Sequence, residues 1–415
     1  MEMRPGYKRE STGDIPEDWD VASLDTIAKV KSGKRLPAGR SLTLSPTPYP
    51  YIRVSDLRQG TVFADNILYV PVDIAPKIKD FRIYSSDIFI SVAGTLGIVG
   101  IVPTTLDGAN LTENADRITD ITCDQRYLYH VIAGDRIQSL ISSSRTVGAQ
   151  PKLAPHRIRS FPIPLPKSRL EQSNVSNALS DIDALIESLA QVIAKKRQIK
   201  QATMQELLTG KRRLPGHSDD WRMLRLRECV SERPRYGINA AGVPLSDALP
   251  TYLRITDISE EGEYIEEQKV SVRCSDDEYF VKSGDLFFAR TGASVGRCYL
   301  HLDRNVKLVF AGFLIRVRVD QSVVDPAFMF LQTQLSSYRR WVAMMSMRSG
   351  QPGINAEEYM ELRVKAPSIS EQKDLIGVFS DMQDEINNIR SKLFKARQIK
   401  QGMMQELLTG RIRLV

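Results

Sequence analysis

The chain has 415 residues, of which 42% are hydrophobic and 26% charged, as in soluble proteins of two to four domains. No apolar run reaches about 18 residues, which argues against a membrane-spanning helix, and residues 1–8 lack the apolar core of a signal peptide. Four scattered cysteines and four scattered histidines argue against a disulfide framework and a zinc site. We therefore expect a cytoplasmic protein without a metal, and the net charge of +7 is compatible with a nucleic-acid partner.

The first predicted region, residues 18–165, contains short strand-like runs such as Asp87-Ile-Phe-Ile-Ser-Val. Clusters of Gly, Pro, Asn and Asp separate these runs, which predicts a strand-rich globular domain with some helix. Its loops are basic and rich in hydroxyl groups, and such side chains contact DNA phosphates and base edges. The candidate DNA-binding residues of this region are Lys31, Lys34, Arg35, Arg40, Arg58 and Arg145.

A long helix is predicted next, because no proline or glycine occurs from Glu171 to Leu208. Apolar residues recur there at steps of three, four and seven, which indicates one apolar stripe. The stripe comprises Val175, Leu179, Ile182, Ile186, Leu189, Ile193, Ile199 and Leu207. About 38 residues at 1.5 Å each make a rod of roughly 57 Å, which one small domain cannot cover. We therefore expect a second helix as its partner.

The second half repeats this organisation. Residues 220–366 are again strand-rich, with candidate DNA-binding residues at Arg233, Arg235, Arg290, Arg297 and Arg348. A second helical segment follows Pro367, with its apolar stripe at Leu375, Phe379, Met382, Ile386, Ile389, Leu393, Ile399 and Leu407. Gly210 and Gly410 stand just beyond the two predicted helix ends, as terminating glycines do.

The two halves are copies of one another. The segment Arg197 to Gly210 recurs as Arg397 to Gly410 with differences only at positions 202/402 and 203/403. Shorter matches include Tyr51-Ile-Arg-Val-Ser-Asp with Tyr252-Leu-Arg-Ile-Thr-Asp, Glu171-Gln172 with Glu371-Gln372, and Trp19 with Trp221. A spacing of about 200 residues far exceeds the 20 to 50 residues of solenoid repeats, so it indicates a duplicated pair of domains.

The duplication predicts an α+β protein in which two strand-rich globular domains are separated by two long antiparallel helices that form a coiled coil, with an internal pseudo-two-fold. The predicted boundaries are residues 1–165, 166–212, 213–366 and 367–415. The alternative is two independent helices, each packed on its own domain. Because the segment before Trp19 supplies the continuation that is missing after Gly410, we expect the chain termini to lie close together.

Catalytic signals are weak, and we expect no catalytic residue. Gly94-Thr-Leu-Gly97 lacks the Lys-Ser/Thr ending of a phosphate-binding loop. Asp325-Pro-Ala-Phe328 misses a proline of the amino-methyltransferase loop, and Asp257 with Glu267-Gln-Lys269 resembles a nuclease metal site only loosely. A nuclease or a methyltransferase in its own right is therefore a lesser alternative.

In this order, and twice, the motifs resemble those of the specificity subunit of type I restriction–modification systems. The resemblance covers nearly the whole chain. It rests on Pro16-Glu-Asp-Trp19, Tyr51-Ile-Arg-Val-Ser-Asp56, Asp87-Ile-Phe-Ile, Gly148-Ala-Gln-Pro151, Glu171-Gln172 and the run from Gln205 to Leu214. One departure is Ser86-Asp87, where the family and the second half have Gly-Asp.

The resemblance implies a non-catalytic DNA-binding subunit without a cofactor of its own. Each target-recognition domain would bind one half of a bipartite DNA site, mainly from the major groove. The helices would set the unread spacer and dock two methyltransferase subunits, which use S-adenosylmethionine. Restriction subunits would add ATP-dependent cleavage in the full complex. A stand-alone coiled-coil scaffold or DNA-binding regulator is the alternative.

The repeat itself separates two kinds of surface. Near-identity of the helix ends suggests that both copies meet the same partner surface, whereas divergence of the domains suggests that they read different DNA, which makes the site asymmetric. The residues predicted to contact the partner subunits or the opposite helix are Arg197, Gln198, Lys200, Gln201, Gln205 and Glu206, with Arg397, Gln398, Lys400, Gln401, Gln405 and Glu406.

Overall fold

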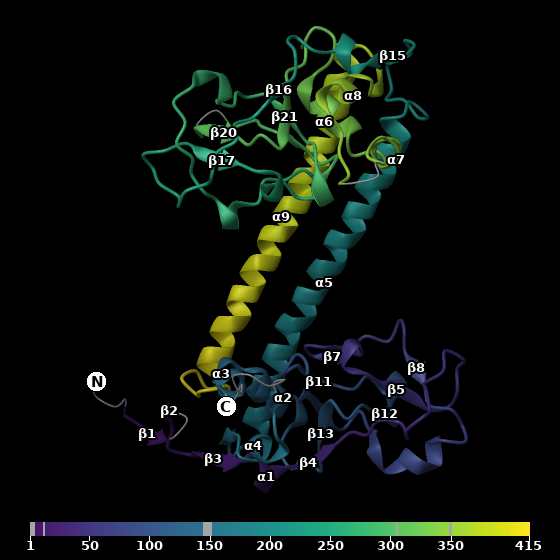
Figure 1. Ribbon diagram of the computed structural model, residues 1–415. Helices are drawn as coiled ribbons and strands as arrows, with labels where there is room; N and C mark the ends of the chain where they lie inside the picture. The colour runs from purple at the N-terminus through teal and green to yellow at the C-terminus, as the bar shows by residue number, and fades with distance from the viewer. Residues whose placement is uncertain (1–4, 11–12, 144–151, 304–305, 348–350) are drawn as a thin grey trace. The chain divides into compact units, whose positions relative to one another are not determined.

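The computed structural model describes residues 5–10, 13–143, 152–303, 306–347 and 351–415 (Figure 1). They form two compact units: unit 1 consists of residues 1–190 with 391–415, and unit 2 of residues 191–390. Each unit combines a strand-rich domain with part of each of two long helices, so the predicted α+β class is confirmed. Among the described residues, no helix is both long and apolar enough to cross a membrane.

Two four-stranded sheets form the strand-rich part of unit 1, in the orders β11-β10-β13-β4 and β8-β5-β12-β9. The strands of the first are β4 (Lys29–Ser32), β10 (Ile88–Ser91), β11 (Val99–Ile101) and β13 (Ala115–Thr119). Those of the second are β5 (Pro50–Ile52), β8 (Leu68–Tyr69), β9 (Arg82–Ile83) and β12 (Ala109–Leu111). Smaller ribbons pair β1 (Tyr7–Glu10) with β2 (Gly13–Pro16), β3 (Trp19–Ser23) with β14 (Pro162–Pro166), and β6 (Leu57–Arg58) with β7 (Thr61–Val62). The short helices are α1 (Leu24–Ile27), α2 (Gln125–Ala133), α3 (Asp135–Ser143) and α4 (Pro155–Arg159).

Unit 2 repeats this topology in a reduced form. Its four-stranded sheet has the order β16-β21-β18-β19, and two strand pairs accompany it. The strands are β16 (Arg235–Tyr236), β18 (Leu286–Ala289), β19 (Cys298–Leu300) and β21 (Leu314–Val317), with β17 (Thr251–Leu253) on β20 (Leu308–Phe310) and β15 (Arg222–Arg225) on β22 (Arg363–Ala366). Its short helices are α6 (Pro326–Gln332), α7 (Ser336–Met345) and α8 (Ala356–Met360).

The two units match at the level of strand register. Strand β10 is buried along its whole length, as is its counterpart β18, because each lies inside its sheet with apolar neighbours on both faces. Phe89 of β10 faces Arg117 of β13, and Phe287 of β18 faces Arg316 of β21. The same residue types therefore occupy the same register positions in both copies.

Two continuous 39-residue helices, α5 (Arg169–Leu207) and α9 (Ile369–Leu407), extend from one unit into the other. Within each unit they lie side by side and run in opposite directions (Figure 1). In unit 1, Asn174 bonds to Leu414 and Asp183 to Lys400, so the α9 partner lies earlier in the chain as α5 advances. The antiparallel pairing expected from the repeat is present within each unit.

The buried seam of the helix pair differs in one respect from the predicted stripe. Val175, Leu179 and Ile193 are buried as expected, but Ile199 and Ile399 are 45% and 55% exposed. A seam that advances by alternating steps of three and four from Ile193 passes through Lys196 and Lys200. The repeated isoleucines lie one position off this seam, and counting them with the core was wrong.

Glycine ends both helices for a conformational reason. Gly210 and Gly410 have φ values of +72° and +68°, a left-handed conformation that other residues adopt only with strain. A β-carbon on Gly410 would also lie 2.5 Å from a side-chain atom of Pro16. The same turn accepts a 2.8 Å hydrogen bond from the Tyr7 hydroxyl to the Gly410 carbonyl. The first strand and the end of the last helix are therefore neighbours, as the circular pattern of the sequence predicts.

Candidate nucleic-acid interface

A repeated arginine–aspartate turn holds loops in both strand-rich domains. The backbone N–H and guanidinium of Arg53 donate to the buried Asp56 carboxylate at 2.8–3.0 Å, and Arg254 does the same with Asp257 at 2.7–3.0 Å. Each guanidinium also bonds a carbonyl further along, at Asn66 and Gln268 respectively. Asp257 is thus occupied by Arg254. Across the described residues no cluster of three or more metal-ligating side chains occurs.

The candidate cations of the first domain are exposed, and several are held by neighbours. Arg35 pairs with Glu113 at 2.6 Å and Arg40 pairs with Asp73. Arg58 donates to two carbonyls of its own turn and lies over a phenyl ring, and the Lys34 ammonium lies 5.6 Å from the Phe81 ring. Lys31 stands exposed on β4. Arg145 lies outside the described residues.

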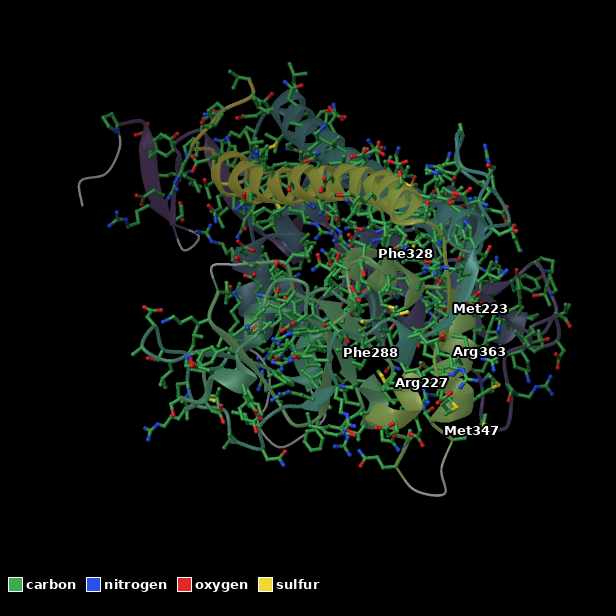
Figure 2. The ribbon with its side chains drawn as sticks, turned by 90° about the horizontal axis from the view of Figure 1, so that it is seen from above. Met223, Arg227, Phe288, Phe328, Met347 and Arg363 are labelled. Atoms are coloured by element: carbon green, nitrogen blue, oxygen red, sulfur yellow. The ribbon has the colours of Figure 1, made fainter. Side chains whose placement is uncertain are left out.

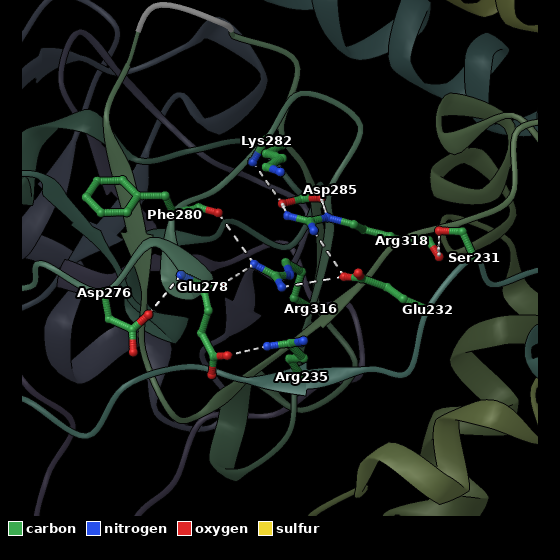
Figure 3. Close-up of polar contacts among 10 residues, drawn as sticks. All are labelled: Ser231, Glu232, Arg235, Asp276, Glu278, Phe280, Lys282, Asp285, Arg316 and Arg318. Carbon is green, nitrogen blue, oxygen red and sulfur yellow. Dashed lines mark hydrogen bonds and ion pairs between the residues drawn. The ribbon is translucent and has the colours of Figure 1, made fainter.

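In unit 2 the candidate arginines have different environments. Arg233 is exposed, and Arg235 on β16 pairs with Glu278 (Figure 3). The Arg290 guanidinium lies 4.8 Å from the centre of the Tyr236 ring, a cation–π geometry that fixes its direction. Arg297 donates to the Ile258 carbonyl at 2.8 Å and therefore braces a loop. Arg348 lies outside the described residues.

A buried arginine organises the loops around β16, and the predicted site residues do not include it. Arg316 is 3% exposed and donates to the carbonyls of Glu278 and Phe280 at 2.8 and 3.4 Å (Figure 3). Its guanidinium also lies 3.5 Å from Glu232 and 5.2 Å from the centre of the Phe310 ring. Burial lowers the pKa of Arg316 from its usual range, although an arginine remains charged. Arg316 therefore connects β21 to Glu232, just before Arg235, and to the segment that contains Glu278 and Phe280.

The first domain has an arginine at the equivalent strand position, and this arginine makes fewer hydrogen bonds. Arg117 occupies the position of Arg316 and donates to the Asp80 carbonyl at 2.8 Å. The neighbouring Arg318 of unit 2 pairs with Asp285 at 2.6 Å and with Glu232 at 3.1 Å (Figure 3). An arginine between apolar residues of a strand, in Ile315-Arg316-Val317, is the sequence signal that could have identified Arg316; Arg117 follows Asp116 and lacks this signal.

A second repeated constellation joins each domain to the helices. The carboxylate of Glu371, 1% exposed, accepts two 2.6 Å bonds from Arg213 and one of 3.2 Å from the Trp221 indole. In unit 1, Glu171 is likewise 1% exposed and is bound by Arg413 and by the Trp19 indole at 3.3 Å. The adjacent Gln172 and Gln372 bond the N-terminus of α2 and α6 through Asp124 N and Asp325 N. The repeated Glu-Gln and Trp motifs therefore build the junction.

The predicted partner-binding residues divide into two groups. Arg197, Gln198, Arg397 and Gln398 are exposed on the helices. Others contact neighbouring segments within their own unit: Lys200 with Gln383, Lys400 with Asp183, Gln201 with Gln334, Gln205 with Ser336, and Glu406 with Arg411. The remaining members are the exposed Glu206, Gln401 and Gln405.

Residues 16–198 match a family model described as the type I restriction modification DNA specificity domain. The chain is 22% identical to the type I restriction enzyme MjaVIII specificity subunit of Methanocaldococcus jannaschii, over 96% of this chain and 94% of that protein. It is 19% identical to the EcoBI specificity subunit of Escherichia coli, over 96% and 87%. Among solved structures, the type I restriction–modification S subunit from M. genitalium matches with a TM-score of 0.59 and 14% identity over 98% of both chains.

Residues 16–198, which hold the strand-rich domain and basic loops of unit 1, match a DNA specificity domain of the restriction–modification class. The chain belongs to the family of specificity subunits of type I restriction–modification systems.

Proposed function

We propose that this specificity subunit reads a bipartite, asymmetric DNA sequence, with one half-site for each strand-rich domain. The observation that carries the proposal is the contrast between a repeated frame and unrepeated loops. The arginine–aspartate turn occurs as Arg53–Asp56 and as Arg254–Asp257, and the strand arginine occurs as the half-buried Arg117 and as the buried Arg316. The exposed cations differ: Arg40 pairs with Asp73 in unit 1, whereas unit 2 presents Arg233 and Arg235 on β16 and its approach. Two similar frames with different basic loops suit two different half-sites.

The subunit itself is non-catalytic in this proposal and binds no cofactor. Adenine methylation, with S-adenosylmethionine, belongs to two methyltransferase subunits, and ATP-dependent cleavage belongs to restriction subunits. A structure that resembles this chain at a TM-score of 0.55 and 16% identity comes from a study of complex assembly of the type I restriction–modification system. A stand-alone DNA-binding regulator is the alternative function.

Methylome sequencing of cells that carry the complete system tests the reading of DNA. We expect methylated adenines in one bipartite motif whose halves differ and whose spacer is unread, with half-sites roughly one helical turn apart. A palindromic or continuous motif would contradict the proposal. A purified chain that methylates or cuts DNA by itself would favour the catalytic alternatives.

The repeated helix ends are the proposed docking surface for the methyltransferase subunits. Ile199 and Ile399 are exposed apolar residues at identical positions, and each is flanked by an exposed Arg-Gln pair. An apolar residue off the buried seam, beside arginine and at the same place in two copies, suits a protein surface that binds two identical partners. Reversing the charge of Arg197 and Arg397 together should weaken co-purification with the methyltransferase subunit while each domain stays folded. Unchanged co-purification would remove these residues from the docking surface.

The same helices are proposed to set the spacer length. Seven residues inserted at the middle of both α5 and α9 preserve the heptad pattern and lengthen each helix by about 10 Å. At 3.4 Å for each base pair this corresponds to about three base pairs. The methylated motif should keep both half-sequences and gain about three spacer positions. A complex that keeps the original spacer would show that other elements fix the distance.

A further inference from the structure

The ribbon of β15 and β22 in unit 2 presents a basic face outside the recognition loops. Arg225 faces Arg363, and Met223 faces Lys365, in the antiparallel register. Residues directly opposite one another share a face, and these four are exposed, while Val364 and Ala366 on the other face are 4% and 1% exposed in the core. Figure 2 labels Met223, Arg227 and Arg363 on this part of the molecule.

The charges of this face are not balanced within the protein. Glu361 is paired with Arg225 at 3.2 Å and also with Arg227. Across the described residues, the side chains of Arg363 and Lys365 on this face have no ion-pair or hydrogen-bond partner. Like charges placed directly opposite in a strand pair destabilise it, so Arg225 and Arg363 cost the ribbon stability in the free protein. An anionic ligand would remove this cost.

The equivalent ribbon of unit 1 lacks the feature. In β3 and β14 the corresponding opposed pairs are Ser23 with Pro162 and Val21 with Pro164, which carry no charge. The basic face is therefore not part of the frame that both units share. It also differs from the docking surface proposed for the methyltransferase subunits, which repeats in both halves.

Neutral hydrogen-bond donors lie beside the cations. A cleft of about 280 Å³ is bordered by Arg363, Ser337 and Trp341, and also by Glu361, whose carboxylate is paired with Arg225 and Arg227. Neither the Ser337 hydroxyl nor the Trp341 indole N–H has a partner within the described part of the chain. Arginine and lysine together with hydroxyl and N–H donors are the groups that contact the DNA backbone, and they carry no base information there.

We propose that the β15–β22 face binds the phosphate backbone of duplex DNA, as a sequence-independent contact made by the second half of the subunit alone. The proposal rests on the DNA binding proposed above and adds a surface to it. Each phosphate contact releases about 0.9 counterion, so the logarithm of the binding constant should fall less steeply with salt when contacts are removed. The contact would add equally to the affinity for the specific site and for any other duplex.

The test replaces the two unpaired cations, as Arg363→Gln with Lys365→Gln in the full-length chain, and uses a random-sequence duplex titrated between 50 and 200 mM salt. The salt slope should fall by about 1.8, and binding at 0.1 M salt by about 60-fold. Removing Arg363 relieves its repulsion of Arg225, so the thermal stability should be unchanged or higher. The matched control is Lys195→Gln with Lys395→Gln, exposed residues that remove the same charge from the helices.

Three results would overturn the proposal. The first is a salt slope equal to that of the unchanged chain, and the second is an equal loss in the Lys195/Lys395 control. The third is unchanged duplex binding with loss of co-purification of a methyltransferase subunit, which would assign the face to a protein partner. Because the probe is random-sequence DNA, the result does not depend on whether the assembled complex reads a bipartite motif, so the two proposals can fail separately.

Discussion

The two helix–domain junctions make the same contacts with different covalent support. In unit 2, Arg213 lies on the continuous segment that leads from α5 to Trp221, and it meets Glu371. In unit 1 the matching Arg413 lies near the end of the chain, and it meets both Glu171 and Asp18. The extra Asp18 pair and the Tyr7–Gly410 bond supply contacts where unit 2 has chain continuity. A junction that is only non-covalent therefore depends more strongly on its buried carboxylate.

The largest expected effect comes from removing that carboxylate in each unit. Glu371→Ala leaves Arg213 and the Trp221 indole without their acceptor, which costs about 3–5 kcal/mol for a buried pair. Glu171→Ala leaves the Trp19 indole without its acceptor and leaves Arg413 with Asp18 alone. Hydrogen exchange resolved by segment should show the loss in unit 1 for the first variant and in unit 2 for the second. Residues 411–415 should also become protease-sensitive in Glu171→Ala only. Equal exposure of the tail and of residues 211–215 would show that chain continuity makes no difference.

The second effect concerns the unrepeated loops. Arg233→Ala should lower discrimination at one half-site by about 1–3 kcal/mol if the side chain reads a base, and should leave the other half-site unaffected. Lys31→Ala on β4 is the matched change in unit 1 and should affect the opposite half. Methylation rates on duplexes with single substitutions in each half measure both. A uniform loss at every position would show a phosphate contact instead.

A third difference between the units is pH dependence. Burial, with smaller effects of Lys400 and Arg126, lowers the pKa of His130 in α2 to about 3, and the matching position in α6 is Leu331. The pKa of His130 in the folded protein lies below its unfolded value of 6.5. The free energy of unfolding of unit 1 is therefore at its full value above pH 6.5, and it decreases as the pH falls towards 3. Between pH 6.5 and 5 unit 1 should lose about 2 kcal/mol from this group. His130→Leu should remove that loss in local hydrogen exchange of unit 1. Burial also lowers the pKa of His301 in unit 2, which the variant leaves unchanged.

The smallest expected effect concerns a lysine of the repeated segment. Lys400 meets the carboxylate of Asp183 at 2.5 Å, whereas Lys200 meets the amide of Gln383 at 2.6 Å. Gln383→Glu would give unit 2 the ion pair that unit 1 already has, a gain of about 0.3–1 kcal/mol because the pair is partly exposed. Thermal unfolding at low and high salt measures the gain, which should shrink with salt. A loss of stability would mean that the amide is the better partner in unit 2.

The sequence predicted the long helices closely, because a run without proline or glycine and a step pattern of three and four leave little choice. It also predicted the duplication and the closeness of the two chain ends, which agrees with the Tyr7–Gly410 hydrogen bond. It misplaced Ile199 and Ile399, because a list of apolar residues ignores the lysines that continue the seam at 196 and 200. The buried Arg316 escaped for a similar reason: charge in a sequence suggests exposure, and only strand pairing shows that this guanidinium lies under loops.

Unit 2 is a single stretch of chain, residues 191–390, whereas unit 1 needs its first 190 residues and its last 25, residues 391–415. During synthesis the ribosome therefore completes every residue of unit 2 before it supplies Arg413 to Glu171. The strand-rich domain of unit 1 is translated first, but unit 1 receives its last residues, 391–415, only after unit 2 is complete. The apolar cluster of unit 1 that contains Val175 and Leu179 therefore stays incomplete until Leu407 and Leu408 are synthesised. The order of folding is then the reverse of the order in which the two domains begin.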